Sequence, residues 1–360
     1  RRATPVRVKG RAVRTYVGVG FGPARPLTGS AVAPAKLMLT AAMAIGRRLQ
    51  ETDCAALRAV SDYFSKDPFD VGASYRRRSN YTTPVQHAME RREQTPAHHP
   101  DAEEVKRVLF NASSPYVGVP SKYQSYGYRS TAVYHGPHYA AYIKRVLGQA
   151  PKFMLEVGSF VGMGAVHTWG PLVSEVGGLV LCVDSWQGDV NMRLGASEEA
   201  FPNTEPLIRS AMVMRNGLPQ IAQTFLGNVV ARNLTNSVFP LAMPSLTGAR
   251  LLALLPWKID LIYLDSAHEA GETLLELHMY YRLLQPGGLL MGDDYEVFPA
   301  VKHDVDYFAK CMNLRVRHVR WRSRSHEWVI RKPKPPKPSA PTAPAAKLAR
   351  GRQRGGPRGG

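Results

Sequence analysis

From Lys152 onward, short apolar runs alternate with longer stretches in which apolar residues recur every three or four positions. The apolar runs are FMLEV (153–157), GLVLCVD (178–184), SVFPLAM (237–243), IDLIYLD (259–265) and LLMGDD (289–294). Helical spacing is found between them at residues 162–173, 221–234 and 272–284. Strands that are apolar along their whole length are typical of a parallel sheet covered by helices on both faces. The pattern therefore predicts a doubly wound α/β fold.

Two further strand-like segments close this region. NLRVRHVRW (313–321) and HEWVIRK (326–332) are separated by a short Arg/Ser turn, which predicts an antiparallel hairpin. Gln-Pro-Gly-Gly at 285–288 predicts a turn before the fifth apolar strand. The expected architecture is a mostly parallel, seven-stranded sheet that ends in a C-terminal antiparallel hairpin.

Residues 51–150 lack this alternation. Helical spacing occurs at 52–64 and at 102–110, and a tyrosine-rich passage follows at 121–147. Tyrosine rings can form a rigid amphipathic wall against a substrate, or they can pack a helical cap onto the body, and the sequence leaves both open. We interpret 51–150 as a helical and aromatic cap that precedes a catalytic or binding domain at 151–331.

The positive charge is concentrated at the two ends of the chain. The 47 Lys and Arg residues outnumber the 28 Asp and Glu residues, for a formal charge of +19, yet residues 51–330 carry equal numbers of both. Residues 1–50 form a basic, acid-free segment, either a disordered leader or an organellar targeting segment. Residues 332–360 are Pro-rich and then Arg/Gly-rich, which predicts a disordered tail.

Composition excludes several classes of protein. Three cysteines are too few and too scattered for a disulfide framework or a zinc site, and Cys182 in an apolar run is expected to be a buried hydrophobe. No stretch approaches the ~20 apolar residues of a membrane span. We therefore expect a soluble protein of the cytoplasm or of an organelle, with no membrane partner.

Polar residues gather where the predicted strands end. These residues are Glu156 and Gly158 after the first strand, Asp184 after the second, Asp265 after the fourth, and Asp293 and Asp294 after the fifth. In open parallel sheets, ligands bind beyond the carboxyl ends of the strands. This edge of the sheet is therefore the expected functional site.

The first strand leads into EVGSFVGMG (156–164), whose glycines allow a ligand to approach the backbone closely. The spacing is not the G-x-G-x-x-G of dinucleotide folds, which argues against a nicotinamide cofactor. Instead, E-x-G-x-x-x-G resembles motif one of class I S-adenosylmethionine-dependent methyltransferases. Asp184 lies 26 residues after Gly158, where a carboxylate can accept hydrogen bonds from ribose hydroxyls; a helix cap or a solvated turn is the alternative.

A longer resemblance covers residues 134–308. LDSAHEAGETLLEL (264–277), LLQPGGLLMGDDY (283–295) and VDSWQGD (183–189) resemble the family typified by macrocin O-methyltransferases. That resemblance implies a Rossmann-like methyltransferase fold with S-adenosylmethionine as cofactor. The implied cofactor-binding residues are Glu156, Gly158, Gly162, Asp184, Ser185, Ser245 and Asp265.

The acids at the ends of the fourth and fifth strands also suggest a metal site. Asp265, Asp293 and Asp294 offer oxygen ligands suited to Mg²⁺ or another divalent cation, which would offset their mutual repulsion. Adjacent residues of a strand point to opposite faces, so both aspartates reach one ion only if the chain turns directly after Gly292. His268, three residues after Asp265, is the candidate general base because histidine titrates near neutral pH.

Three functions follow as hypotheses. The first is a metal-dependent O-methyltransferase that acts on a hydroxyl of a sugar or natural-product acceptor. The second is an RNA methyltransferase recruited through the basic tail, which the neutral body disfavours, and the third is a non-catalytic cofactor-binding protein of the same fold. The expected partner is thus a small-molecule or glycan hydroxyl acceptor, with nucleic acid not favoured, and the formation of homo-oligomers is left open.

Overall fold

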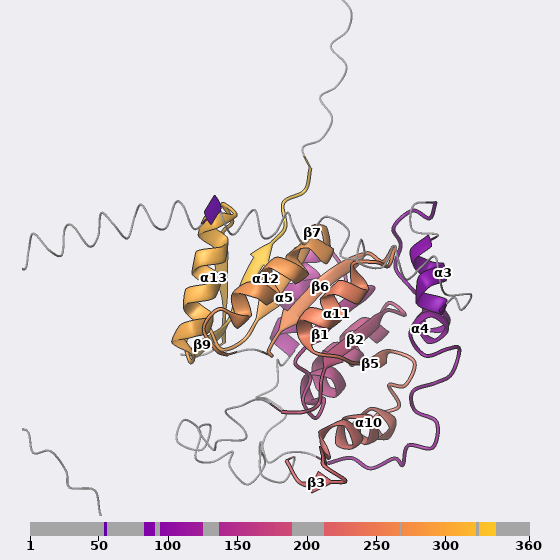
Figure 1. The fold of residues 1–360 in the computed structure, drawn as a ribbon. Helices are drawn as coiled ribbons and strands as arrows, with labels where there is room; N and C mark the ends of the chain where they lie inside the picture. Colours follow the sequence, from indigo (N-terminus) through magenta and orange to yellow (C-terminus); the bar gives the residue numbers. More distant parts are fainter. Residues whose placement is uncertain are drawn as a thin grey trace, which may run out of the picture. The chain divides into compact units, whose positions relative to one another are not determined.

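The computed structural model describes residues 54–55, 83–90, 94–124, 137–188, 212–266, 268–321 and 324–335. The chain divides into two compact units, Arg1–Leu57 and Arg58–Gly360. Only residues 54 and 55 of the first unit are described, and every element named from here on belongs to the second (Figure 1). The predicted leader, most of the predicted helix at 52–64 and the tail beyond residue 335 lie outside the described residues, so the domain boundaries remain predictions.

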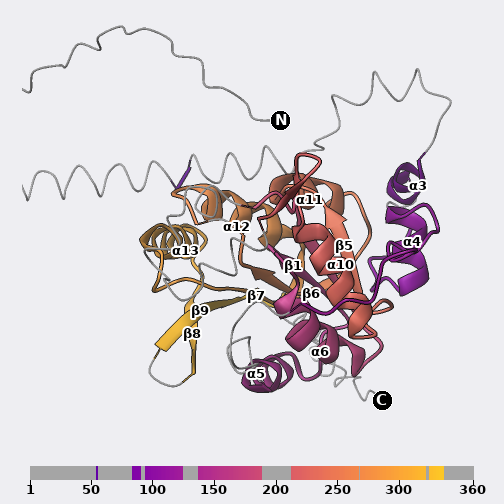
Figure 2. The same cartoon turned by 90° about the horizontal axis from the view of Figure 1, so that it is seen from below.

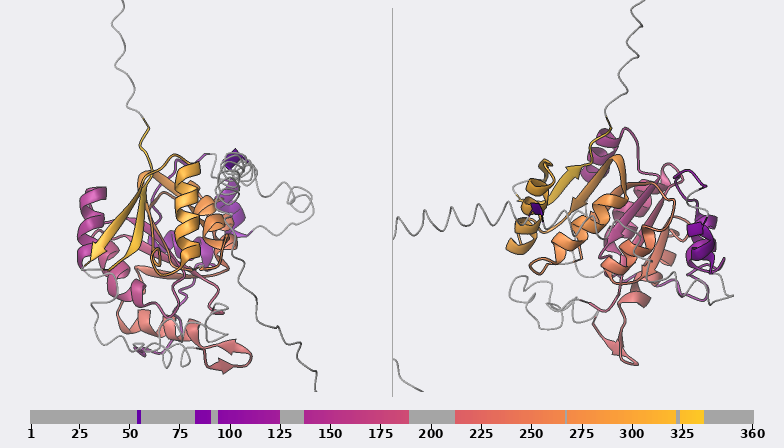
Figure 3. Two further views of the ribbon diagram at one scale, coloured as in Figure 1. Left: turned by 90° about the vertical axis from the view of Figure 1, so that its left-hand side faces the viewer. Right: turned by 45° about the horizontal axis from the view of Figure 1, so that its top comes forward.

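Seven strands form one sheet in the order β5-β2-β1-β6-β7-β9-β8. The five parallel strands are β1 (Phe153–Val157), β2 (Leu179–Asp184), β5 (Val238–Ala242), β6 (Ile259–Leu264) and β7 (Leu284–Gly292). The antiparallel hairpin is β8 (Val316–Trp321) with β9 (Arg324–Arg331), at one edge of the sheet (Figure 3). The prediction of a doubly wound, mostly parallel seven-stranded sheet with a C-terminal hairpin is confirmed.

Helices cover both faces of this sheet (Figure 2). One face carries α4 (Ala102–Leu109), α11 (Ser245–Leu252), α12 (Glu272–Leu283) and α13 (Pro299–Cys311). The other face carries α5 (Pro137–Leu147), η2 (Ala165–Trp169), α6 (Gly170–Ser174) and α10 (Ile221–Ala231). None of the helices in the described part of the chain is long and apolar enough to cross a membrane.

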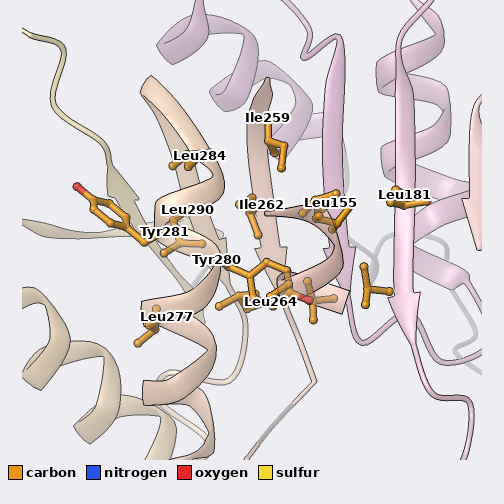
Figure 4. Close-up of a cluster of buried hydrophobic side chains, with 14 of the residues drawn as sticks. Leu155, Leu181, Ile259, Ile262, Leu264, Leu277, Tyr280, Tyr281, Leu284 and Leu290 are labelled. Atoms are coloured by element: carbon orange, nitrogen blue, oxygen red, sulfur yellow. The ribbon is translucent and has the colours of Figure 1, made fainter. Parts of the chain in front are cut away.

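The strands are apolar throughout because each contributes to two cores. In β1, Phe153, Leu155 and Val157 belong to the core under α11 and α12, whereas Met154 belongs to the opposite one. Figure 4 shows Leu277 and Tyr280 of α12 beside strand residues of the first core. Each of these two side chains is fully buried, which stabilises the fold by about 1.5–3 kcal/mol per residue.

The described part of the predicted cap packs firmly on the body. α3 (Pro84–Glu90) and α4 bury Ala88, Val105 and Val108 in the core. Farther along, the Tyr116 hydroxyl donates a hydrogen bond to the Val238 carbonyl at 2.6 Å. Of the tyrosine-rich passage, 137–147 is helix α5, with Tyr139 buried, and 125–136 lies outside the described residues.

The Gln-Pro-Gly-Gly segment differs from its prediction. Instead of a turn that precedes the strand, it lies within β7, where the pairing with β6 jumps from Leu284 to Leu289 while β6 advances from Ile259 to Leu261. The segment therefore forms a bulge, and Gly287 supports it with a φ of 87° that suits glycine.

A small hairpin escaped the prediction altogether. β3 (Met214–Arg215) and β4 (Leu218–Pro219) form a two-stranded antiparallel sheet. Its turn is Asn216-Gly217, with φ values of 52° and 80°. An Asn-Gly pair at positive φ is a strong hairpin signal, so the sequence carried the necessary information.

Candidate functional site

The carboxyl ends of β1, β2 and β6 meet at Gly158. Its N–H donates to the Val183 carbonyl at 2.9 Å, and the Asp265 N–H donates to the Val157 carbonyl at 2.8 Å. Gly158 has a φ of 86°, and a Cβ at this position would lie 2.0 Å from the Asp265 carbonyl oxygen. Only glycine fits here, because any side chain would separate the two strand ends.

A cavity of about 600 Å³ opens beside this junction, within the usual range for small-molecule sites. Six of the residues predicted for the site line it, namely Gly158, Asp184, Ser185, Ser245, Asp265 and His268. They lie at or just beyond the carboxyl ends of β1, β2, β5 and β6, so the topology of the sheet collects residues that are far apart in the chain.

Glu156 and Gly162, also predicted to bind the cofactor, do not line this cavity. Glu156 is 3% exposed, and its carboxylate accepts a hydrogen bond from the Cys182 thiol at 3.4 Å. Burial raises the pKa of the Cys182 thiol, which keeps its proton available for this bond. Cys182 is fully buried, as predicted. In this structure, the Glu156 carboxylate lies against Gly164 of the glycine loop, and Gly162 lies against the ring of Phe225.

Asp184 connects two loops through its carboxylate. One oxygen accepts the Phe160 N–H at 2.8 Å, and the other accepts the Trp186 N–H at 2.6 Å. Burial raises the pKa of Asp184, although these N–H groups oppose the effect. Each carboxylate oxygen has two lone pairs, so the group retains capacity for further donors such as ribose hydroxyls.

The chain does turn directly after β7. Asp294 has a φ of 62°, and its N–H donates to Asp293 Oδ1 at 2.8 Å. The Val297 and Phe298 N–H groups then donate to the Asp294 carbonyl at 3.1 and 2.9 Å. The turn on which the prediction depended is therefore present, and the charges of Asp293 and Asp294 both act on Asp265.

The imidazole of His268 lies between two of the predicted acids. Its Nε2 is 2.8 Å from Asp294 Oδ2 and 4.0 Å from Asp265 Oδ1, and its ring packs on Phe298 with centroids 4.5 Å apart. Ligand-capable atoms of Asp265, His268 and Asp294 lie within 4.8 Å of one another. Asp293 lies outside this group, and its predicted role as a ligand is a matter for proposal.

The electrostatics at Asp265 reflect the crowding of acids. Burial raises the pKa of this carboxyl well above its usual value, and the charges of Asp293 and Asp294 raise it further, while His268 opposes them. At ~4 Å and an effective dielectric of ~20, two like charges repel by about 4 kcal/mol. A bound cation would instead lower the pKa of Asp265, because it stabilises the ionised carboxylates.

Two buried acids near the site were not predicted. Glu276 on α12 is 2% exposed and accepts hydrogen bonds from Ser266, and Asp304 on α13 is 1% exposed and accepts from the Gly271 and Leu274 N–H groups. For Glu276, the available signal was an acid within the predicted helix at 272–284, whereas Asp304 lies on α13, for which no helical range was predicted. That signal alone does not identify the partner.

Comparisons with known proteins agree with this geometry. Residues 155–295 match a family model described as a methyltransferase domain. No curated protein sequence matches the chain. Together with the observed sheet order and the loop at Gly158, the family match supports a class I S-adenosylmethionine-dependent methyltransferase.

Solved structures that resemble the chain do so distantly. The O-methyltransferase from Bacillus cereus in complex with SAH is 13% identical, over 65% of this chain and 90% of that chain, with a TM-score of 0.37. TomG, the Streptomyces achromogenes O-methyltransferase involved in tomaymycin synthesis, is 12% identical, over 55% and 80%, with a TM-score of 0.38. Similarity at this level carries no information about the function of this chain.

Proposed function

We propose that this protein is an S-adenosylmethionine-dependent, divalent-metal-dependent O-methyltransferase of the macrocin O-methyltransferase type. Its acceptor would be a hydroxyl of a sugar or natural-product scaffold, and His268 would be the general base. The observation that carries the proposal is the contact of 2.8 Å between His268 Nε2 and Asp294 Oδ2, in one group with Asp265, which lines the cavity.

The cavity fits the proposed cofactor in size and in the chemistry of its walls. Bound S-adenosylmethionine would supply an electrophilic sulfonium methyl group. An acceptor oxygen would attack the methyl carbon in line with the C–S bond, and S-adenosylhomocysteine would leave with the bonding electron pair. Gly158 lets a ligand approach the backbone closely, while Asp184, Ser185 and Ser245 offer hydrogen-bonding groups for its polar parts. The main tasks of the protein are then to align the acceptor oxygen with the methyl group and to remove the hydroxyl proton.

The donor set also fits a divalent cation. Carboxylate oxygens are the ligands that Mg²⁺ prefers, whereas an imidazole in the set is more typical of transition metals. We therefore assign Asp265, Asp293 and Asp294 as the residues that would hold Mg²⁺ or a similar ion, and we keep His268 for the proton. A bound cation would lower the pKa of an acceptor hydroxyl placed beside it.

His268 is well placed to take that proton. Asp294 orients the imidazole through Nε2 and would stabilise the imidazolium that forms, and Phe298 restricts the ring from one side. General base catalysis of this kind contributes about 10²- to 10⁴-fold to a rate. The His268→Ala variant should therefore lose most turnover and keep its affinity for S-adenosylhomocysteine.

Mg²⁺ binding measured by calorimetry distinguishes the proposed metal ligands from the proposed general base. Asp265→Asn and Asp294→Asn should lose both Mg²⁺ binding and turnover, whereas His268→Ala should lose turnover alone. Asp306→Asn, an exposed acid on α13, is the control and should change neither. Full turnover in excess chelator would refute the metal role, and loss of Mg²⁺ binding in His268→Ala would make the histidine a ligand instead of a base.

A further inference from the structure

One buried carboxylate lies between the loop after β6 and the start of α11, both of which line the cavity. Both oxygens of Glu276 lie 2.8 Å from Ser266 Oγ, which follows Asp265 in the loop after β6. The Ser245 side chain, at the start of α11, also interacts with this carboxylate and lowers its pKa. Glu276 is 2% exposed and lies on α12, whose neighbours Leu277 and Tyr280 are fully buried, so its backbone is firmly placed.

The position of Glu276 relative to the site is informative. It lines the large cavity together with Asp265 and His268, and it also lines a second cavity of about 10 Å³ that reaches Asp293. The loop between β6 and α12 carries both Asp265 and His268. A shift of Ser266 would therefore displace the proposed ligand and the proposed base together.

Keeping a carboxylate at this position is unfavourable for folding. Burial raises the pKa of Glu276 to about 7, although the hydroxyls of Ser245 and Ser266 lower it. A buried acid that is incompletely compensated destabilises the folded state, and an apolar side chain of similar size is often neutral or stabilising. The chain thus holds a destabilising group where a leucine would fill the same space.

We propose that Glu276 is a positioning residue, whose carboxylate braces Ser266 and Ser245 and thereby sets Asp265 and His268 against the bound methyl donor. This inference rests on the proposed function for its catalytic meaning. The brace itself is a property of the free protein. Its effect is therefore measurable without any acceptor.

Three variants test the brace against a matched control. Glu276→Leu fills the space without hydrogen bonds. Glu276→Gln keeps one acceptor oxygen and adds an N–H donor, which a serine hydroxyl oxygen can accept. Ser266→Ala removes the loop hydroxyl that donates to Glu276. Asp260→Asn is the control, because Asp260 is a buried acid at the other end of β6, where it accepts the Lys152 N–H at 2.7 Å. Asp260→Asn should lower the stability of the protein without disturbing the residues that line the cavity.

Amide hydrogen exchange of residues 265–271 is the first readout. Glu276→Leu and Ser266→Ala should each raise exchange there about tenfold, since a hydrogen bond to a charged group is worth at least that factor. Glu276→Gln should stay within about threefold of the wild type, and Asp260→Asn should leave this loop unchanged. Unchanged exchange in both Glu276→Leu and Ser266→Ala would overturn the proposal, and Ser266→Ala decides the matter if Glu276→Leu does not fold.

The second readout is the affinity for S-adenosylhomocysteine and the turnover number. The affinity and the turnover number should each fall about tenfold in Glu276→Leu and return toward the wild-type values in Glu276→Gln. The thermal stability of Glu276→Leu at pH 8 should not fall with them. Wild-type affinity in Glu276→Leu would overturn the proposal and leave the methyltransferase assignment intact. If the wild type itself binds no S-adenosylhomocysteine while exchange responds as expected, the proposed function fails and the brace stands.

Discussion

Single residues at this site combine backbone and side-chain roles. Asp294 turns the chain through its positive φ of 62°, and its carboxylate meets His268 at 2.8 Å. Gly158 contributes only by lacking a side chain, because the Asp265 carbonyl occupies the space of a Cβ. Contacts as close as these respond sharply to small chemical changes.

Gly158→Ala should strongly weaken cofactor binding. The added methyl group would press on the Asp265 carbonyl and push the ends of β1 and β6 apart. A displacement of about 1 Å can cost ~10²-fold in function, and we expect a loss of that size in the affinity for S-adenosylhomocysteine, measured by calorimetry.

Gly148→Ala is the matched control for that variant. Gly148 has nearly the same φ, 89°, but nothing lies within 4 Å of its hypothetical Cβ. It should lose about 1 kcal/mol of stability from backbone strain alone and keep full affinity. Equal losses of affinity in both variants would show that strain, and not the contact with Asp265, is responsible.

At the scale of elements, helix α12 is held by its neighbours at its N-terminus. Gly271, which precedes the helix, has no side chain to cap it, and Asp304 of α13 accepts the Gly271 and Leu274 N–H groups at 2.8 and 3.1 Å. A carboxylate at a helix N-terminus satisfies unpaired donors and interacts favourably with the helix dipole.

Asp304→Asn should destabilise the protein by about 1 kcal/mol, and Asp304→Ala by about 2 kcal/mol, because the amide keeps an acceptor and the methyl group does not. Urea unfolding measures both values. The Asp306 side chain lies on the same helix and is 48% exposed, so Asp306→Asn should change the free energy of unfolding little. An equal loss from the substitution at Asp306 would contradict the capping role.

The packing of α12 on α13 should make stability depend on pH. The ring of His278 meets Phe308 edge to face at 4.9 Å, and burial, with a smaller effect of Arg282, lowers the pKa of His278 to about 4. An unfolded histidine titrates near 6.5, so the unfolded state binds more protons between about pH 4 and 6.5. The free energy of unfolding should therefore rise with pH across that window, by up to about 3 kcal/mol.

His278→Leu should remove this contribution. Urea unfolding at pH 4.5 and at pH 7 should show a smaller difference in the variant than in the wild type. His87→Leu alters an exposed histidine of α3 and should preserve the wild-type difference. If the free energy of unfolding depends on pH identically in His278→Leu and the wild type, His278 is not the cause of that dependence.

At the scale of the whole molecule, the site and the charge belong to different parts of the chain. The neutral stretch at 51–330 contains every proposed site residue, whereas the basic excess lies in residues 1–50 and 331–360. Under the proposed function, the basic ends play no part in methylating a small hydroxyl acceptor.

Deletion of residues 336–360 should therefore leave turnover of such an acceptor within about twofold of the wild type, because this segment contains none of the proposed site residues. A salt titration supplies the complementary measurement. Methylation of RNA that weakens steeply with salt and is lost on this deletion would instead support the RNA hypothesis.

Much of the fold was predictable because burial on both faces leaves a direct record in the sequence. β1 was located to the residue, and β2, β5 and β6 to within a residue or so at each end, since a strand covered on both faces must be apolar throughout. The bulge at Gln285–Gly288 was misread, because a Pro-Gly-Gly sequence suits a turn and a bulge equally well.

The strand ends likewise marked where the site would form, because parallel strands present their carboxyl ends at one edge. Only the tertiary structure decided which of the site residues contact one another. Asp294 meets His268 while Asp293 turns back to the Asp294 N–H, and Glu276 meets Ser266 across a loop. Such pairings depend on backbone dihedrals and on distances between side chains, and the order of apolar and polar residues along a chain constrains neither closely enough.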